Sequence, residues 1–166
     1  SNMPLKIGGI AMKAGLGALL EKAPSIGSKP KTTNTGGNDI WNTNDQFRYA
    51  YQKLNTDFSF SIKIDSLYNV HQYAKAGLMI RKSLNSNSAH GLINIFPSGN
   101  TEFGYRTNNG ESMEAKSGPQ IDLTDARLKM KKSGKIIEFF VLSSNDWQKL
   151  GELNVSKWGK SFYVGI

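Results

Sequence analysis

A strict two-residue alternation of apolar and polar side chains most limits how this chain can fold. From Phe58 to Asp65 every even-numbered residue is Phe or Ile, and every odd-numbered residue is Ser, Lys or Asp. Successive side chains of a strand point to opposite faces of its sheet, so the pattern predicts an antiparallel strand with one buried face. The same period occurs at 47–52, 75–81, 92–96, 102–106 and 128–131, and further strands are expected at Ile136–Leu142 and at 161–166.

Turn-forming residues separate these predicted strands. The sequences SNS, PSGN, TNNG, KSGK and SSND begin at positions 86, 97, 107, 132 and 143. Short strands divided by such turns, without a long helical pattern between them, are typical of a β-sandwich or jelly roll. The 166 residues suit one domain, and the absence of cysteine excludes a disulfide framework and thiolate chemistry.

The first 37 residues differ in composition from the rest. Ser1 and Asn2, before Met3, are typical of a scar left by cleavage of a tag. An apolar stretch interrupted by Lys13 and Glu21 follows, and then a run rich in Pro, Ser, Thr, Gly and Asn. We therefore expect 1–37 to hold an N-terminal segment and linker that adds one strand or a short helix, and 38–166 to form the sandwich. No convincing signal-peptide cleavage site follows the apolar stretch, and no segment is long enough to span a membrane.

The charge of the chain is strongly positive. Lysine and arginine number 21 against 13 acidic residues, a net charge of +8, and five lysines with one acidic residue precede Asp39. Such an excess suits an anionic partner such as nucleic acid, an acidic glycan or a membrane surface. It equally suits solubility combined with a basic tail, which is the favoured interpretation. No specific nucleic-acid contact is expected.

Residues that would perform covalent or hydrolytic catalysis are missing from the sequence. His71 is expected in a loop and His90 at the start of a strand, and no G-x-S-x-G nucleophile turn is present. A sandwich glycosidase would place acidic residues alternately along one strand, and no such row occurs. Glu111 and Glu114 are expected in a loop, and Asp122 and Asp125 beside a turn, all as solvated surface. The chain is therefore expected not to be an enzyme.

Metal and phosphate sites have little support in the sequence. Two scattered histidines do not form a transition-metal site, and no phosphate-binding glycine loop is present. Calcium needs only carboxylates and carbonyls, so Asp39 and Asp45, with Asn44, remain candidates for a calcium ion. The same residues are also common in turns. No cofactor is expected, and calcium is the alternative.

A set of polar residues is expected on the non-core faces of the strands. Long hydrogen-bonding side chains around a small floor of Gly77 and Gly104 would suit a polar ligand lying across a sheet. An ordinary solvated face, with Glu102 paired to Arg81 or Arg106, is the alternative. The members of the set are Gln52, Lys75, Arg81, Asn94, Glu102 and Arg106.

Two tryptophans could add an aromatic surface for a sugar ring. Trp41 lies near the start of the predicted sandwich and Trp147 in its last part. Each could instead fill the core or an edge, since Trp side chains are usually largely buried. The core is the favoured position for Trp147, and neither position is favoured for Trp41.

Several strings, taken in order, carry a family resemblance. They are DIW at 39–41, YQ at 51–52, AKAGLMIR at 74–81 and FGYRT at 103–107, followed by RLKMKKSGKIIEFFVLSSNDWQKLG at 127–151 and FYVGI at 162–166. Over residues 38–166 the chain resembles concanavalin-A-like domains of unknown function. These include "regulation of enolase" proteins and sandwich domains attached to some β-xylosidases and other secreted bacterial glycan-active proteins. The family-typical positions are Trp41, Asp45, Gln52, Lys75, Gly77, Met79, Arg81, Tyr105, Arg106 and Trp147.

The resemblance implies a jelly-roll sandwich with a lectin-like, carbohydrate-binding accessory role, secreted or at the cell surface. It departs from the family in a shortened SSNDW hairpin and in the absence of a strand after YVGI, which would leave an edge open to a strand-swapped or edge-paired dimer rather than a monomer. The alternative function is a protein- or polyanion-interaction domain that uses that edge or the basic N-terminal segment. A glycoside hydrolase is less favoured. The expected ligand contacts are Gln52, Lys75, Arg81, Arg106, Asn94, Trp41 and Asp45.

Overall fold

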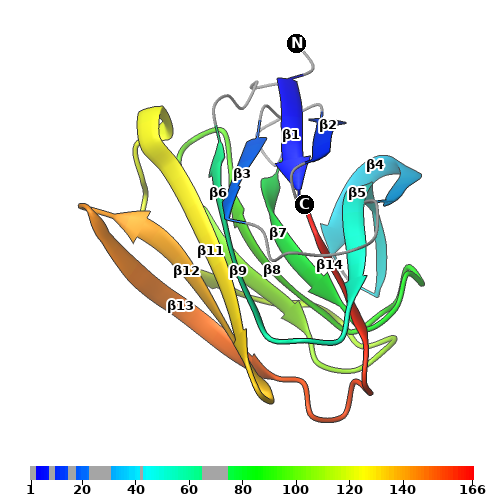
Figure 1. Ribbon diagram of the computed structural model, residues 1–166. Coiled ribbons are helices and arrows are strands. Elements are labelled where there is room, and N and C mark those ends of the chain that lie inside the picture. The colour runs from blue at the N-terminus through cyan, green and yellow to red at the C-terminus, as the bar shows by residue number, and fades with distance from the viewer. Residues whose placement is uncertain (1–2, 8–9, 15–17, 23–30, 42, 65–74) are drawn as a thin grey trace.

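The computed structural model describes residues 3–7, 10–14, 18–22, 31–41, 43–64 and 75–166, with side chains for Thr43, 51–64 and 75–166. It is an all-β, sandwich-like arrangement of two antiparallel sheets. In Figure 1, β6, β11, β12 and β13 lie on the left and β7, β14, β5 and β4 on the right. Among the described residues, no helix has the length and apolar character needed to cross a membrane.

The larger sheet has seven strands in the order β10-β9-β8-β7-β14-β5-β4, each antiparallel to its neighbours. The strand β14, last in the sequence, lies between β7 and β5, so the order in the sheet does not follow the order in the chain. The bounds are β4 (Lys31–Trp41), β5 (Asn44–Leu54), β7 (Ala76–Arg81), β8 (His90–Ile95), β9 (Thr101–Arg106), β10 (Glu114–Ser117) and β14 (Phe162–Gly165).

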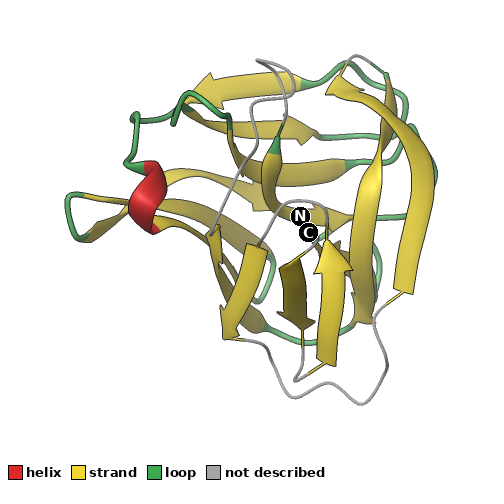
Figure 2. Ribbon diagram, turned by 90° about the horizontal axis from the view of Figure 1, so that it is seen from above, coloured by secondary structure: helices red, strands yellow, loops and turns green. Residues whose placement is uncertain are grey.

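The smaller sheet has five strands in the order β13-β12-β11-β6-β3. Its strands are β3 (Ala18–Lys22), β6 (Phe58–Ile64), β11 (Ala126–Ser133), β12 (Ile136–Ser143) and β13 (Asp146–Asn154). A separate hairpin pairs β1 (Met3–Ile7) with β2 (Ile10–Ala14). The 3-10 helix η1 (Leu123–Asp125), drawn red in Figure 2, is capped by Asp122, whose carboxylate accepts from the Thr124 N–H at 2.9 Å.

The core lies between the two sheets, and the alternation of β6 predicts its contribution correctly. Phe58, Phe60, Ile62 and Ile64 are all buried and belong to one apolar cluster. Removing each of these side chains from water contributes roughly 1.5–3 kcal/mol. The facing strands supply, among others, Leu78, Ile80, Ile93, Phe103, Leu128, Met130, Phe139, Val141, Phe162 and Val164.

The sheets approach each other closely at Gly151 on β13. A Cβ atom there would lie 2.3 Å from Cδ2 of Phe103 on the other sheet. Only glycine leaves room for that ring. Beside it, the pairing of β12 with β13 shifts between Phe139 and Phe140, a β-bulge that places Leu150 in the core.

A second apolar cluster covers part of the other side of the seven-stranded sheet, which points away from the five-stranded sheet. We call this side the outer face. Met79 on β7 and Leu92 on β8 pack there with Met113, which follows β9. Tyr51 joins them from β5, and Tyr163 of β14 lies partly buried against the cluster, its ring edge-on to Tyr51 with centroids 5.5 Å apart. The outer face is therefore partly a packed surface rather than a solvated one.

Candidate ligand-binding face

Strand register brings four of the predicted polar residues together on the outer face. Directly opposed residues of an antiparallel pair share a face. Arg81 is opposite His90, and His90 is opposite Arg106, so these three form one row across β7, β8 and β9. Gly77, Asn94 and Glu102 form a parallel row in the same way. The outer face thus holds two polar rows, separated by the row of Met79 and Leu92.

Arg81 is a buried side chain that holds a loop. It is 1% exposed, and it donates to the carbonyl oxygens of Ser83 (Nε, 3.2 Å) and Asn85 (Nη2, 2.6 Å). The expectation of a solvated outward face is wrong here. The segment that follows β7 turns back, so that its carbonyl groups surround the guanidinium.

Arg106 has the same role on β9. It is fully buried and donates to the carbonyl oxygens of Glu111 (Nε, 2.7 Å) and Ser88 (Nη1, 3.0 Å), with Nη1 3.4 Å from Nδ1 of His90. It therefore fastens two loops, 82–89 and 107–113, to the same row of the sheet. Hydrogen bonds from a charged donor are the strong ones, so this arrangement stiffens both loops.

Asn94 is the exceptional member of the second row. It is 0% exposed, and neither its Oδ1 nor its Nδ2 has a hydrogen-bond partner. Its neighbours across the strands, Gly77 and Glu102, are each partly exposed. A buried amide without partners costs about 1–3 kcal/mol for each unsatisfied group, so such a side chain calls for a water or ligand partner.

The two glycines of the expected floor differ in their surroundings. A Cβ on Gly77 would lie 2.1 Å from the Ile93 carbonyl oxygen and 3.0 Å from Cβ of Asn94, so the strand β8 itself requires glycine there. A Cβ on Gly104 would lie 2.8 Å from Cε of Met113. Met113 covers Gly104, which therefore does not form an open floor for a ligand.

Lys75 and Phe96 extend the outer face beyond the row of Asn94. Lys75 precedes Gly77 by two residues, and Phe96 follows Asn94 by two. Both are partly exposed, and the ammonium of Lys75 lies 5.8 Å from the centroid of the Phe96 ring. This cation–π pair places a charge and an aromatic surface beside the buried amide.

Gln52 is not on the outer face, and the expectation that it would be is wrong. The register pairs Gln52 with Val164 and Leu54 with Phe162, both members of the core between the sheets. Gln52 is 2% exposed on that core-facing side. The neighbouring Tyr51 takes the outer face instead, where the second apolar cluster buries its ring.

Three predicted contacts belong to β4 and β5, where the side chains lie outside the described residues. The backbone register there pairs Trp41 with Asn44, Ile40 with Asp45 and Asp39 with Gln46. His71 also lies outside the described residues. Within the described part of the chain, no group of three or more His, Cys, Asp or Glu side chains could hold a metal ion.

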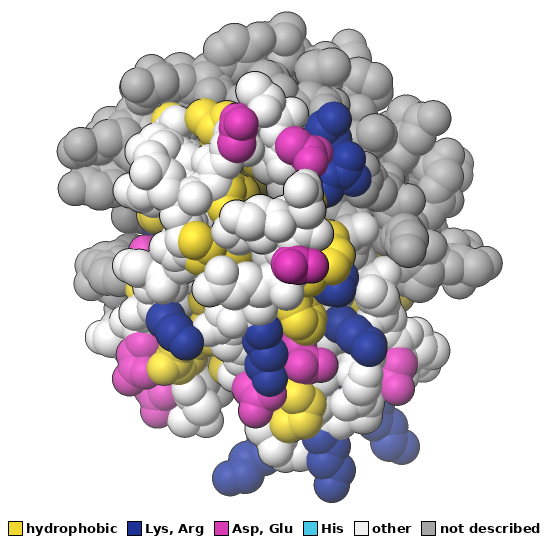
Figure 3. Space-filling model, turned by 90° about the vertical axis from the view of Figure 1, so that its left-hand side faces the viewer, with side chains coloured by type: hydrophobic (Ala, Val, Ile, Leu, Met, Phe, Trp, Pro, Cys, Tyr) yellow, Lys and Arg dark blue, Asp and Glu magenta, His cyan; other side chains and the backbone are white. Residues whose placement is uncertain are grey.

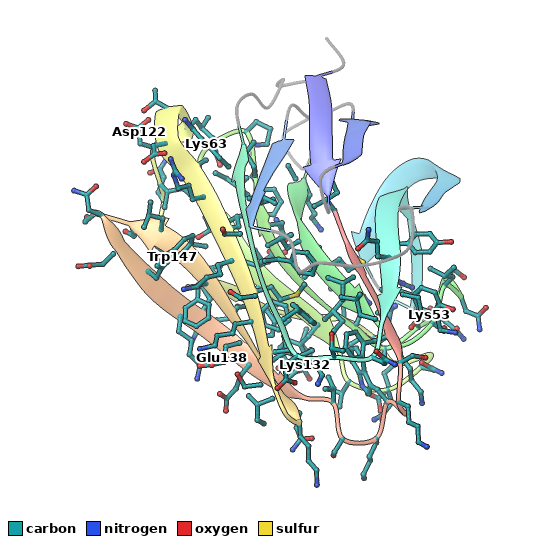
Figure 4. The ribbon with its side chains drawn as sticks, viewed as in Figure 1. Lys53, Lys63, Asp122, Lys132, Glu138 and Trp147 are labelled. Carbon is teal, nitrogen blue, oxygen red and sulfur yellow. The ribbon has the colours of Figure 1, made fainter. Side chains whose placement is uncertain are left out.

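Trp147 lies on the outside of the five-stranded sheet and not in the core, which corrects the favoured expectation. It is 37% exposed and paired with Leu142. The ammonium of Lys129 lies 4.6 Å from its ring centroid and 4.5 Å from that of Phe140. Figure 3 shows basic, acidic and apolar side chains interleaved on this side, and Figure 4 shows where Trp147 and Glu138 lie.

The loop acids are exposed, as expected, and hold neighbouring groups. Glu111 accepts from the side-chain nitrogen (2.8 Å) and backbone N–H (3.2 Å) of Asn108. Glu114 accepts from the hydroxyl of Tyr105, which raises the pKa of that phenol. Asp125 forms an ion pair with Arg127 at 2.7 Å. These contacts tie turns and strand ends together.

Sequence reasoning missed a pocket of about 480 Å³ at one end of the sandwich. Three segments far apart in the sequence form it: the strand end and loop at Lys82 and Ala89, the turn 107–109, and the turn 154–158. TNNG at 107–110 is a recognisable turn signal, but no sequence signal joins it to the other two segments.

Comparison with known protein families and with curated proteins gives no match to this sequence.

Proposed function

We propose that this chain is a non-catalytic module that binds a glycan on the outer face of its seven-stranded sheet. The observation that carries the proposal is the buried amide of Asn94, whose oxygen and nitrogen both lack a partner. A sugar hydroxyl can donate and accept at once, so neighbouring hydroxyls suit a carboxamide. Such a contact would remove the cost of the unsatisfied amide only in the complex.

The surroundings of Asn94 support a polar ligand with a ring. The partly exposed Gly77 and Glu102 leave its row open on both sides. Phe96 offers an aromatic face at one end, and Lys75 adds hydrogen-bond donors beside it. The buried Arg81 and Arg106 support the face from the next row by fixing the loops beside it. In this proposal Lys75 and Asn94 contact the ligand, and the two arginines position the loops.

The two antiparallel sheets are compatible with the finer fold that the family resemblance implies, a concanavalin-A-like jelly roll. We include that fold, and action outside the cell as part of a secreted or surface-attached protein, in the proposal. Both rest on the strings AKAGLMIR and FGYRT and their neighbours. Polar ligands of such sandwiches would lie across strands rather than within one loop.

The test begins with a glycan array of the intact chain and continues with calorimetry on the glycans that bind. Asn94→Leu keeps the side-chain volume and removes both amide groups. We expect at least a tenfold loss of glycan affinity with the fold retained. The matched control is Asn55→Leu, since Asn55 is exposed in the turn between β5 and β6 and should leave affinity unchanged. An array without binding, or equal affinity in the Asn94→Leu protein, would overturn the proposal.

A further inference from the structure

The pocket at the end of the sandwich has walls that are built before any ligand arrives. The Lys82 N–H donates to the Ala89 carbonyl at 3.0 Å, and Asn109 Oδ1 accepts from the Ala89 N–H at 2.8 Å. The third wall is a turn closed by the bond from Trp158 N–H to Val155 O at 3.0 Å. Preformed walls reduce the ordering cost of binding.

The pocket is rich in donors and poor in acceptors. Two of its three lining carboxamides already use their oxygens on backbone N–H groups, Asn109 on Ala89 (2.8 Å) and Asn154 on Ser156 (2.9 Å). The amide nitrogen of Asn109 and the indole N–H of Trp158 donate to no group in the described part of the chain. Buried or half-enclosed donors of this kind need acceptors from outside.

The charge of the pocket points the same way. Lys82 and Lys157 line it, both are exposed, and neither makes an ion pair or hydrogen bond with its ammonium within the described structure. No Asp or Glu is among the lining residues. The nearby sequence position Glu111 is engaged by Asn108 through both carboxylate oxygens. Two cations without counter-charges in one concave site attract an anion.

We propose that this pocket binds a small molecule carrying an oxyanion group, a carboxylate, sulfate or phosphate, through Lys82 and Lys157. The lysines take the charged oxygens, and the Asn109 amide and Trp158 indole N–H groups donate to the remaining acceptors. The volume of about 480 Å³ lies within the range of small-ligand sites, so it holds more than a bare ion. This site is separate from Asn94, and it does not rest on the glycan proposal.

The test uses the indole N–H signals in two-dimensional NMR spectra of the intact chain, because the sequence has only three tryptophans. Sulfate, phosphate, glucuronate and uncharged glucose are the probes. We expect a saturable shift of the Trp158 signal with the anions and none with glucose, while the Trp147 signal stays in place. Glucuronate binding more tightly than the inorganic ions identifies a sugar acid, and equal affinities identify a free oxyanion.

Charge-removing variants decide which residues are responsible. Lys82→Gln with Lys157→Gln should weaken anion binding at least tenfold. Lys116→Gln with Lys131→Gln removes two exposed lysines elsewhere and should leave binding unchanged. The Asn94→Leu protein should bind the anions normally, which separates this site from the outer face. Absence of a saturable Trp158 shift, or equal affinity in the Lys82 and Lys157 double variant, would overturn the proposal.

Discussion

Arg106→Met should destabilise the folded protein by roughly 3–6 kcal/mol. The guanidinium is fully buried and donates to the carbonyl oxygens of Ser88 at 3.0 Å and Glu111 at 2.7 Å. Hydrogen bonds to a charged group contribute about 1.5–3 kcal/mol each, and two are lost in this variant. Methionine fills much of the volume, so the loss reports on polar contacts rather than on a cavity.

The assay is urea unfolding followed by tyrosine and tryptophan fluorescence, combined with amide hydrogen exchange. Exchange should quicken in the loops 82–89 and 107–113, which Arg106 fastens, and change little in β11 and β12. Arg106→Lys should recover about half of the loss, because one ammonium cannot reproduce the two-pronged geometry of the guanidinium. Arg127→Met is the control, since Arg127 forms an exposed ion pair with Asp125 and such pairs contribute about 0–1 kcal/mol.

A destabilisation below about 1 kcal/mol for Arg106→Met would show that the two carbonyl contacts do not hold the loops, against a central expectation for a buried charged donor. Equal exchange in both loops with and without Arg106 would lead to the same conclusion.

Three further outcomes follow from individual contacts. Gly151→Ala should cost about 1–3 kcal/mol by overpacking, because its Cβ would lie 2.3 Å from the ring of Phe103; calorimetric melting measures this, and an unchanged melting temperature would contradict the close approach of the sheets. The Asp57 carboxylate accepts from Lys132 Nζ (3.1 Å) and Gly134 N–H (3.0 Å), which lowers its pKa below the ordinary 3.8. Its stabilisation is therefore full above that pH and is lost as the pH falls through the lower folded-state pKa, so the stability difference between the original protein and Asp57→Asn should shrink on acidification. Glu114→Gln should bring the raised pKa of Tyr105 back toward 10.0, as followed by tyrosinate absorbance, and an unmoved titration would discount the Glu114 contact.

The sequence predicts the architecture where one physical rule acts alone. The alternation from Phe58 to Ile64 needs only a half-buried sheet, and the structure buries all four apolar residues. Gln52 was misplaced because its neighbour Tyr51 is equally at home in a core or under a second apolar cluster, and only the register with Gly165 shows which. Trp147 was misplaced because the bulge beside Phe140 sends Leu150 inward instead.

The candidate site was less predictable from sequence, for a different reason. Alternation places Arg81, Asn94 and Arg106 on one face, but it says nothing about what lies over that face. The burial of the arginines depends on loops that return to the sheet, and the isolation of the Asn94 amide depends on the absence of any donor or acceptor near it in space. The pocket with Lys82 and Lys157 depends on three distant turns meeting, which no local pattern encodes.

The position of β14 has a consequence for synthesis of the chain. Until residues 162–165 have been made, β5 with β4 and β7 with β8, β9 and β10 are two separate ribbons, each with an open edge where β14 will pair. Closing the sheet joins segments more than eighty residues apart, Arg81 with Tyr163 for example, and such distant pairings form slowly. A ribosome must therefore release this stretch before the sheet can close, and the nascent chain carries two unpaired strand edges until then.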